Sequence, residues 1–153
     1  MVKNLNKNGF SLTELLIVIA IISILAGIAI PQLSKYYREY RFSDYASQME
    51  YLVKQAKIYA MERTVNVGVC VQGNTLSIRN LGTNRGAGIC TGTAIKSMTV
   101  TDSYVTLGGT GGSFDPRGLA IQIGNTCVSY SGKFVKMHIS KAGIRKEAGT
   151  GGC

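Results

Sequence analysis

The sequence predicts an α+β protein in which one long N-terminal helix packs on a C-terminal head of antiparallel β-strands. Three observations support this prediction. An almost wholly apolar run extends from Phe10 to Ile30, an amphipathic helical pattern follows it, and from Thr64 the hydrophobic period shortens to two between glycine-rich turns. A chain of 153 residues fits one such head and has enough apolar side chains to form a core.

The apolar run lies in "GFSLTELLIVIAIISILAGIAIP", residues 9–31, and is long enough to span a bilayer. It is longer than the apolar region of a secretory signal peptide, which has about 7–15 residues, so we expect it to stay attached. The basic leader before it, with Lys3 and Lys7, is expected in the cytoplasm and the remainder outside. Glu14 is unexpected here, because a carboxylate at the centre of a membrane helix costs roughly 2.5–3.5 kcal/mol on insertion scales.

An amphipathic segment follows the apolar run. Its apolar side chains recur at helical spacing on one face: Tyr45, Met49, Leu52, Val53, Ala56, Tyr59 and Ala60. We therefore expect one helix from about Ser11 to Arg63, with Gly27 and Pro31 weakening it near the middle. A group of tyrosines suits either an interface belt and subunit contacts or ordinary packing on the head: Tyr36, Tyr37, Tyr40 and Tyr45.

The second half of the chain has short alternating segments separated by turns. They are "VNVGVCVQ", "TLSIRNL", "SMTVTDSYVTL", "LAIQIG", "NTCVSYSG" and "KFVKMHISKAG". Gly73-Asn74, between the first two, is a hairpin signal. We expect an antiparallel sheet of about six or seven strands lying on the helix.

The chain has four cysteines and a single histidine, which limits the metal sites and disulfides that it can form. No C-x-x-C pair is present, which disfavours a zinc site, and we expect neither a metal nor a cofactor. An even cysteine count behind a membrane-targeting segment favours two disulfides in an oxidising compartment. Four cysteines allow three connectivities. We favour Cys70–Cys90 and Cys127–Cys153, because each pair closes a local loop.

The segment "GFSLTE" at residues 9–14, with the apolar helix and Pro31 after it, resembles the class III signal of type IV pilins and type II secretion pseudopilins. The resemblance implies that a prepilin peptidase cleaves after Gly9 and methylates the new amino group on Phe10. It also implies that Glu14 pairs with the N-terminal ammonium of a neighbouring subunit in a filament. A charge in an apolar setting is tolerated when it is paired, so this pairing would stabilise Glu14 on assembly.

The implied type IV pilin-like fold divides the chain into four segments. These are a cleaved leader at 1–9, a transmembrane and filament-core helix at 10–31, an amphipathic helix at 32–63 and a β-rich globular head at 64–153. The precursor would be a single-pass protein of the bacterial inner membrane, and the assembled subunit would lie in a periplasmic or extracellular pilus.

Three later stretches, "SFDPRGLA", "CVSY" and "VKMHISKAGIRK", resemble the GspH/FimT-type minor pilins and pseudopilins. The residues that match the turn motif and the closing motif of that subfamily are Phe114, Pro116, Gly118, Ile139, Ser140 and Gly143. The first stretch is also simply a favourable turn, because its proline fixes φ.

A formal net charge of +9 favours anionic partners such as nucleic acid, acidic lipid headgroups or acidic polysaccharide, or else only keeps the protein soluble. Some members of the resembled subfamily bind DNA through a Gly-Arg-x-Arg motif. Residues 143–146 are Gly-Ile-Arg-Lys, so the first arginine is missing. The candidate site for double-stranded DNA is a basic strand face that we expect to collect Lys133, Lys136, Lys141, Arg145 and Lys146 around His138. The alternative is a solvated strand face.

These features predict a minor type IV pilin that is incorporated in a pilus and has a structural role in assembly initiation, adhesion or DNA uptake, with DNA binding for natural transformation as the candidate role of the basic patch. The expected partners are the prepilin peptidase, other pilins, the inner membrane and double-stranded DNA. We expect no enzymatic activity, because no phosphate-binding loop or nucleophile elbow is present and His138 has no partner at a recognisable spacing. One alternative is a type II secretion pseudopilin. Another, from a different class, is a membrane-tethered periplasmic binding protein or enzyme.

Overall fold

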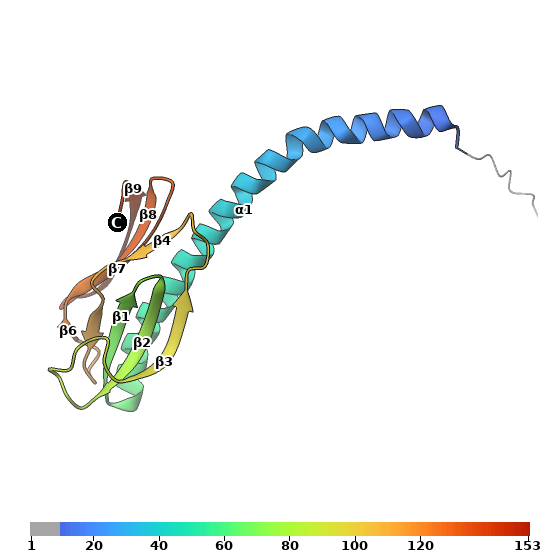
Figure 1. The fold of residues 1–153 in the computed structure, drawn as a ribbon. Coiled ribbons are helices and arrows are strands. Elements are labelled where there is room, and N and C mark those ends of the chain that lie inside the picture. Colours follow the sequence, from blue (N-terminus) through green and yellow to red (C-terminus); the bar gives the residue numbers. More distant parts are fainter. Residues whose placement is uncertain (1–9) are drawn as a thin grey trace, which may run out of the picture. The chain divides into compact units, whose positions relative to one another are not determined.

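The computed structural model describes residues 10–153 (Figure 1). The chain divides after residue 38, and residues 39–153 form a compact unit. The leader 1–9, which includes Gly9, lies outside the described residues.

A single helix, α1 (Leu12–Arg63), accounts for 52 residues and confirms the expected long helix. Its first turn closes where the backbone N–H of Leu15 donates to the carbonyl of Ser11 at 3.2 Å. It remains helical through Pro31. It ends before Thr64, whose positive φ of 53° is incompatible with continuing a right-handed helix.

The head contains two antiparallel sheets rather than the single sheet expected (Figure 1). The first has the order β3-β2-β1-β5-β6. Its strands are β1 (Asn66–Gln72), β2 (Thr75–Gly82), β3 (Thr93–Thr99), β5 (Gly112–Phe114) and β6 (Ala120–Gln122). The predicted hairpin at Gly73-Asn74 is confirmed, because Gln72 pairs with Thr75 across that turn.

The second sheet has the order β4-β7-β8-β9. Its strands are β4 (Thr106–Gly108), β7 (Gly124–Tyr130), β8 (Lys133–Ser140) and β9 (Gly143–Thr150). The edge strand β9 was not predicted, because Ile144 is its only large apolar side chain and most of its residues are exposed.

One hydrophobic core joins the second half of α1 to both sheets. The predicted helix stripe is confirmed: its residues lie in the core, with Tyr59 partly buried at its margin. From the sheets, the fully buried side chains include Val67, Ile78, Phe114 and Met137. Among the tyrosines, Tyr45 packs in this core, whereas the side chains of Tyr36, Tyr37 and Tyr40 are exposed.

The stretch 97–107, expected to be one strand, is interrupted between β3 and β4. The carboxylate of Asp102 accepts hydrogen bonds from Arg41 Nε and from the Tyr45 hydroxyl, both at 2.8 Å. The bond from Tyr45, followed by that from Arg41, lowers the pKa of Asp102. These bonds attach the intervening loop to α1, which explains why the strand does not continue.

Both disulfides have the favoured connectivity, Cys70–Cys90 and Cys127–Cys153. The first attaches the loop of residues 83–92 to strand β1. Gly68 permits that close approach, because a Cβ at this position would lie 2.3 Å from the carbonyl oxygen of Ile89. The second disulfide joins the buried Cys127 of β7 to the exposed Cys153.

Candidate functional site

The N-terminal turn of α1 presents the residues of the predicted processing signal. Ser11 precedes the helix and its hydroxyl lies 2.7 Å from that of Thr13. Glu14 lies in the first turn, where the positive end of the helix dipole favours a carboxylate. Within residues 10–153 no cation lies within ion-pair distance of Glu14.

The apolar part of α1 exposes its side chains. The helix is long and apolar enough to cross a membrane, and none of its most apolar 18-residue window is buried within the chain. Phe10, directly before it, is 85% exposed. Exposed apolar surface on this scale indicates contact with lipid or with other protein chains.

The five candidate DNA-binding cations do not share one face, and that expectation is wrong. Side chains alternate along a strand, so Lys133 lies on the same face of β8 as Met137, which is buried in the core. Lys146 pairs across the hairpin with Met137 and lies on that face too. Each makes an ion pair with α1: Lys133 with Glu39 at 2.8 Å, and Lys146 with Glu50 at 2.7 Å.

These two ion pairs attach the β8–β9 hairpin to the helix. The hydrogen bond with Glu39 raises the pKa of Lys133. The hydrogen bonds from Lys146 and then Lys54 lower the pKa of Glu50. All these groups are partly exposed, so each pair stabilises the fold only modestly.

The face of the β8–β9 hairpin that points away from the core, here called its outer face, carries or adjoins the remaining candidate cations. Lys136 lies opposite Glu147, and His138 lies opposite Arg145. His138 Nε2 lies 2.7 Å from Glu147 Oε2, and Arg145 Nη2 lies 3.8 Å from the same oxygen. The hydrogen bond with His138 is the largest cause that lowers the pKa of Glu147, and the positive charges of Arg145 and Lys136 lower it further. Lys141 is exposed in the connecting turn, so three of the five cations remain available on or beside this face.

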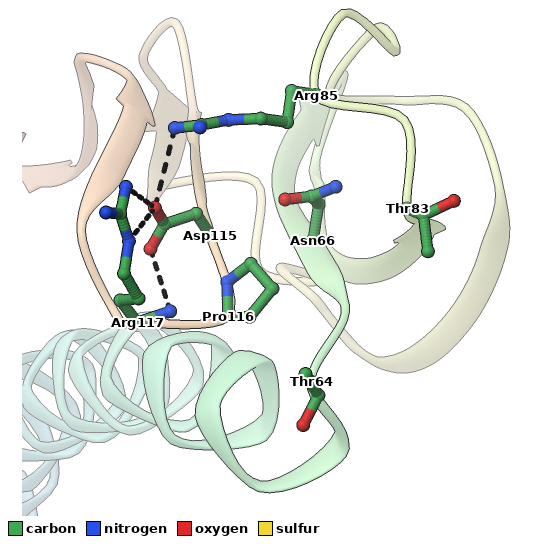
Figure 2. Close-up of a pocket in the computed structure, with 7 residues that line it drawn as sticks. All are labelled: Thr64, Asn66, Thr83, Arg85, Asp115, Pro116 and Arg117. Atoms are coloured by element: carbon green, nitrogen blue, oxygen red, sulfur yellow. Dashed lines mark hydrogen bonds and ion pairs between the residues drawn. The ribbon is translucent and has the colours of Figure 1, made fainter.

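A pocket of about 320 Å³ lies beside the turn after β5, where the sequence indicated only a favourable turn (Figure 2). Asp115 is 2% exposed, and its Oδ1 accepts the backbone N–H groups of Arg117 and Leu119, both at 2.9 Å. Its Oδ2 accepts from Arg117 Nη2 at 2.9 Å. Burial alone would raise the pKa of Asp115, but these bonds outweigh it and hold the pKa below the ordinary value.

Comparisons with known proteins bear on the N-terminal motif and on the fold. Residues 4–30 match the family model described as the prokaryotic N-terminal methylation motif. Two crystal forms of the type IV minor pilin FimU from Pseudomonas aeruginosa strain PAO1 share the fold. One is 16% identical with a TM-score of 0.55, and the alignment covers 73% of this chain and 92% of that one. The other is 17% identical with a TM-score of 0.51, covering 69% and 91%.

The chain therefore carries the prokaryotic N-terminal methylation motif and shares the fold of the type IV minor pilin FimU. Its N-terminal apolar helix and motif fit a membrane-anchored precursor. The minor pseudopilin EpsH from the type 2 secretion system of Vibrio cholerae is a weaker match, with 12% identity, a TM-score of 0.47 and coverage of 72% and 95%. No curated protein sequence matches this pilin-like chain.

Proposed function

We propose that this pilin-like protein is a minor pilin with a structural rather than an enzymatic role. Its precursor is anchored in the bacterial inner membrane, a prepilin peptidase cleaves it after Gly9 and methylates Phe10, and the mature subunit enters a pilus outside that membrane. The observation that supports this most is the methylation motif at residues 4–30, which continues into a helix whose apolar side chains are exposed.

Glu14 supplies the physical reason for assembly. Cleavage after Gly9 creates an ammonium on Phe10, and before cleavage no side-chain cation within residues 10–153 pairs with Glu14. An unpaired carboxylate is unfavourable in hydrocarbon and is stabilised by an opposite charge. The ammonium of a neighbouring subunit provides that charge, so the monomer gains stability when it enters a filament.

Mass analysis of the mature N-terminus and a Glu14→Ala variant test this function. The mature chain should begin at N-methylated Phe10. Glu14→Ala should be processed normally but enter purified filaments at a small fraction of the wild-type level. Glu62→Ala, which removes an exposed carboxylate near the other end of α1, should assemble normally. An unprocessed chain beginning at Met1, or normal incorporation of Glu14→Ala, would contradict the proposal.

The rival machine is a type II secretion system, in which a pseudopilin has the same N-terminal chemistry. We take a pilus as the first choice because the chain shares the fold of the minor pilin FimU, with a TM-score of 0.55. Deleting the gene separates the two: loss of surface pili with normal secretion supports the minor pilin, and loss of secretion with normal pili supports the pseudopilin.

We also propose that the outer face of the β8–β9 hairpin binds double-stranded DNA. Lys136, Lys141 and Arg145 lie on or beside this face, while Lys133 and Lys146 are held against α1. Glu147 lies among the outer cations and reduces their net charge. The contacts would be with phosphates, so the binding is expected to be independent of sequence and to weaken steeply with salt.

A salt series with two charge-removal variants, one that removes three positive charges and one that removes two, tests DNA binding. The full chain in neutral detergent micelles is titrated with a DNA duplex. Lys136→Gln/Lys141→Gln/Arg145→Gln should weaken binding strongly and reduce the slope of log affinity against log salt. Lys133→Gln/Lys146→Gln should retain most of the affinity, although it also removes positive charge. Equal losses in both variants would show that net charge alone attracts DNA, and the outer face would not be the site.

A further inference from the structure

The pocket beside Asp115 combines two arginines with a single carboxylate. Arg117 follows Asp115 in the turn, and Arg85 comes from the loop between β2 and β3 (Figure 2). Both guanidinium groups approach the Asp115 carboxylate, so the three ionised groups leave one net positive charge in the pocket. The site is therefore matched to a ligand with one negative charge.

Arg117 makes shorter and more numerous hydrogen bonds to Asp115 than Arg85 does. Arg117 donates two charge-assisted hydrogen bonds to the same oxygen, Asp115 Oδ2, from Nε at 3.1 Å and from Nη2 at 2.9 Å. Arg85 reaches the same oxygen only through Nη2 at 3.5 Å, and its side chain is 61% exposed. Arg85 thus keeps most of its N–H donors directed away from Asp115.

The position of Arg85 is set by covalent and hydrogen-bonded constraints on its loop. The Cys70–Cys90 disulfide attaches the loop to β1. Gln122 Nε2 donates to the carbonyl of Ala87 in the same loop at 3.3 Å. These two attachments restrain the loop that carries Arg85, so less loop ordering is required when a ligand binds.

The opposite wall of the pocket offers groups that pair with hydroxyls. Asn66 is 1% exposed, and its amide nitrogen donates to the carbonyl of Gly82 at 3.0 Å. Its amide oxygen has no hydrogen-bond donor within residues 10–153 and points to the side on which Pro116 lies (Figure 2). A buried acceptor without a donor is unfavourable by about 1–3 kcal/mol. Thr64 and Thr83 also line this pocket.

We propose that this pocket binds a monocarboxylate that also carries hydroxyl groups, the chemistry of a uronic acid unit in an acidic polysaccharide. Its carboxylate would contact Arg85 and the outer N–H groups of Arg117, and a hydroxyl would donate to Asn66. The volume of about 320 Å³ is at the lower end of the range for small-molecule sites, about 300–1,000 Å³, and accommodates one sugar unit. The site differs from the β8–β9 hairpin proposed for DNA.

Isothermal titration calorimetry with glucuronate tests the proposal, using the full chain in neutral detergent micelles at low ionic strength. Glucuronate should give saturable binding, and Arg85→Gln should weaken it by about tenfold. Lys54→Gln on α1, which removes one positive charge from an exposed position elsewhere, should change the affinity by less than about twofold.

Two further titrants separate the parts of the ligand. Glucose lacks the carboxylate and should bind at least about tenfold more weakly than glucuronate; acetate lacks the hydroxyls and should also bind more weakly. Circular dichroism of Arg85→Gln should match wild type, since Arg85 is an exposed loop residue. Absence of glucuronate binding, or equal losses in Arg85→Gln and Lys54→Gln, would overturn the site. Equal affinity for acetate and glucuronate would overturn its sugar chemistry.

Discussion

Asp115 closes the turn after β5 by satisfying donors that would otherwise have no partner. Its buried carboxylate accepts two backbone N–H groups of the turn and the guanidinium fork of Arg117. Gly118 completes the turn with φ of 76°, which favours glycine, and a Cβ there would lie 2.7 Å from the sulfur of Met61. A carboxylate, a proline and a glycine at these three positions therefore place the turn directly on α1.

Replacing the carboxylate should destabilise the fold in a way that depends on pH. At pH 7, Asp115→Asn should lower the free energy of unfolding by about 1–3 kcal/mol, because it leaves buried donors poorly matched. The folded-state pKa of Asp115 lies below the unfolded value of about 3.9. The stabilisation is therefore fully present above that unfolded value and is lost as the pH falls toward the folded one.

Urea unfolding of the two proteins across a pH series measures this difference. Asp44→Asn is the matched control, since Asp44 is only partly buried and its ion pair with Arg41 is 3.7 Å long. That control should change stability by less than about 0.5 kcal/mol. A difference between wild type and Asp115→Asn that does not shrink at low pH would show that the carboxylate charge is not what stabilises the turn.

The loop of residues 83–92 is the element whose position depends most on a covalent bond. Cys70→Ala/Cys90→Ala should lower the free energy of unfolding by about 2–4 kcal/mol, because the bond closes a loop of 20 residues. It should also weaken glucuronate binding, since the loop carries Arg85. The measurements are urea unfolding and calorimetry. Cys127→Ala/Cys153→Ala is the control for binding, and an equal loss of glucuronate affinity in both variants would contradict the assigned role of this loop.

Elements with strong periodicity were predictable from the sequence, and those defined by long-range contacts were not. The helix followed from apolar residues at helical spacing, and the hairpin of β1 and β2 from Gly73-Asn74. The edge strand β9 lacks alternation, so only its pairing with β8 defines it. The division into two sheets and the interruption at Asp102 likewise depend on tertiary contacts.

The candidate site shows the same limit. The methylation motif is a local sequence signal, and residues 4–30 match the corresponding family model. The basic patch was assembled from sequence proximity, but the period of two in β8 places Lys133 on the face opposite Lys136. The Asp115 pocket joins residues of the β1 and β5 region to Arg85, which lies 30 positions from Asp115 in sequence. No local sequence pattern indicates that Arg85 and Asp115 lie side by side.

At the scale of the whole molecule, the part of the chain that forms a core is separate from the part that exposes apolar surface. The buried apolar side chains lie at Tyr45 or later within residues 10–153, and residues 39–153 form one compact unit. The exposed apolar side chains of α1 before that unit add nothing to this core. Stability of the head and insertion into a membrane or filament are therefore set by different residues.

This separation predicts that a fragment of residues 39–153 folds by itself. Urea unfolding followed by circular dichroism should give a single cooperative transition. Met49→Ala, at a fully buried position of α1, should lower the free energy of unfolding by about 2–5 kcal/mol in the fragment and in the full chain alike. Tyr40→Ala, on the same helix but 67% exposed, should have an effect within about 0.5 kcal/mol. A fragment without a cooperative transition, or a Met49→Ala effect confined to the full chain, would show that the preceding helix is needed to hold the head together.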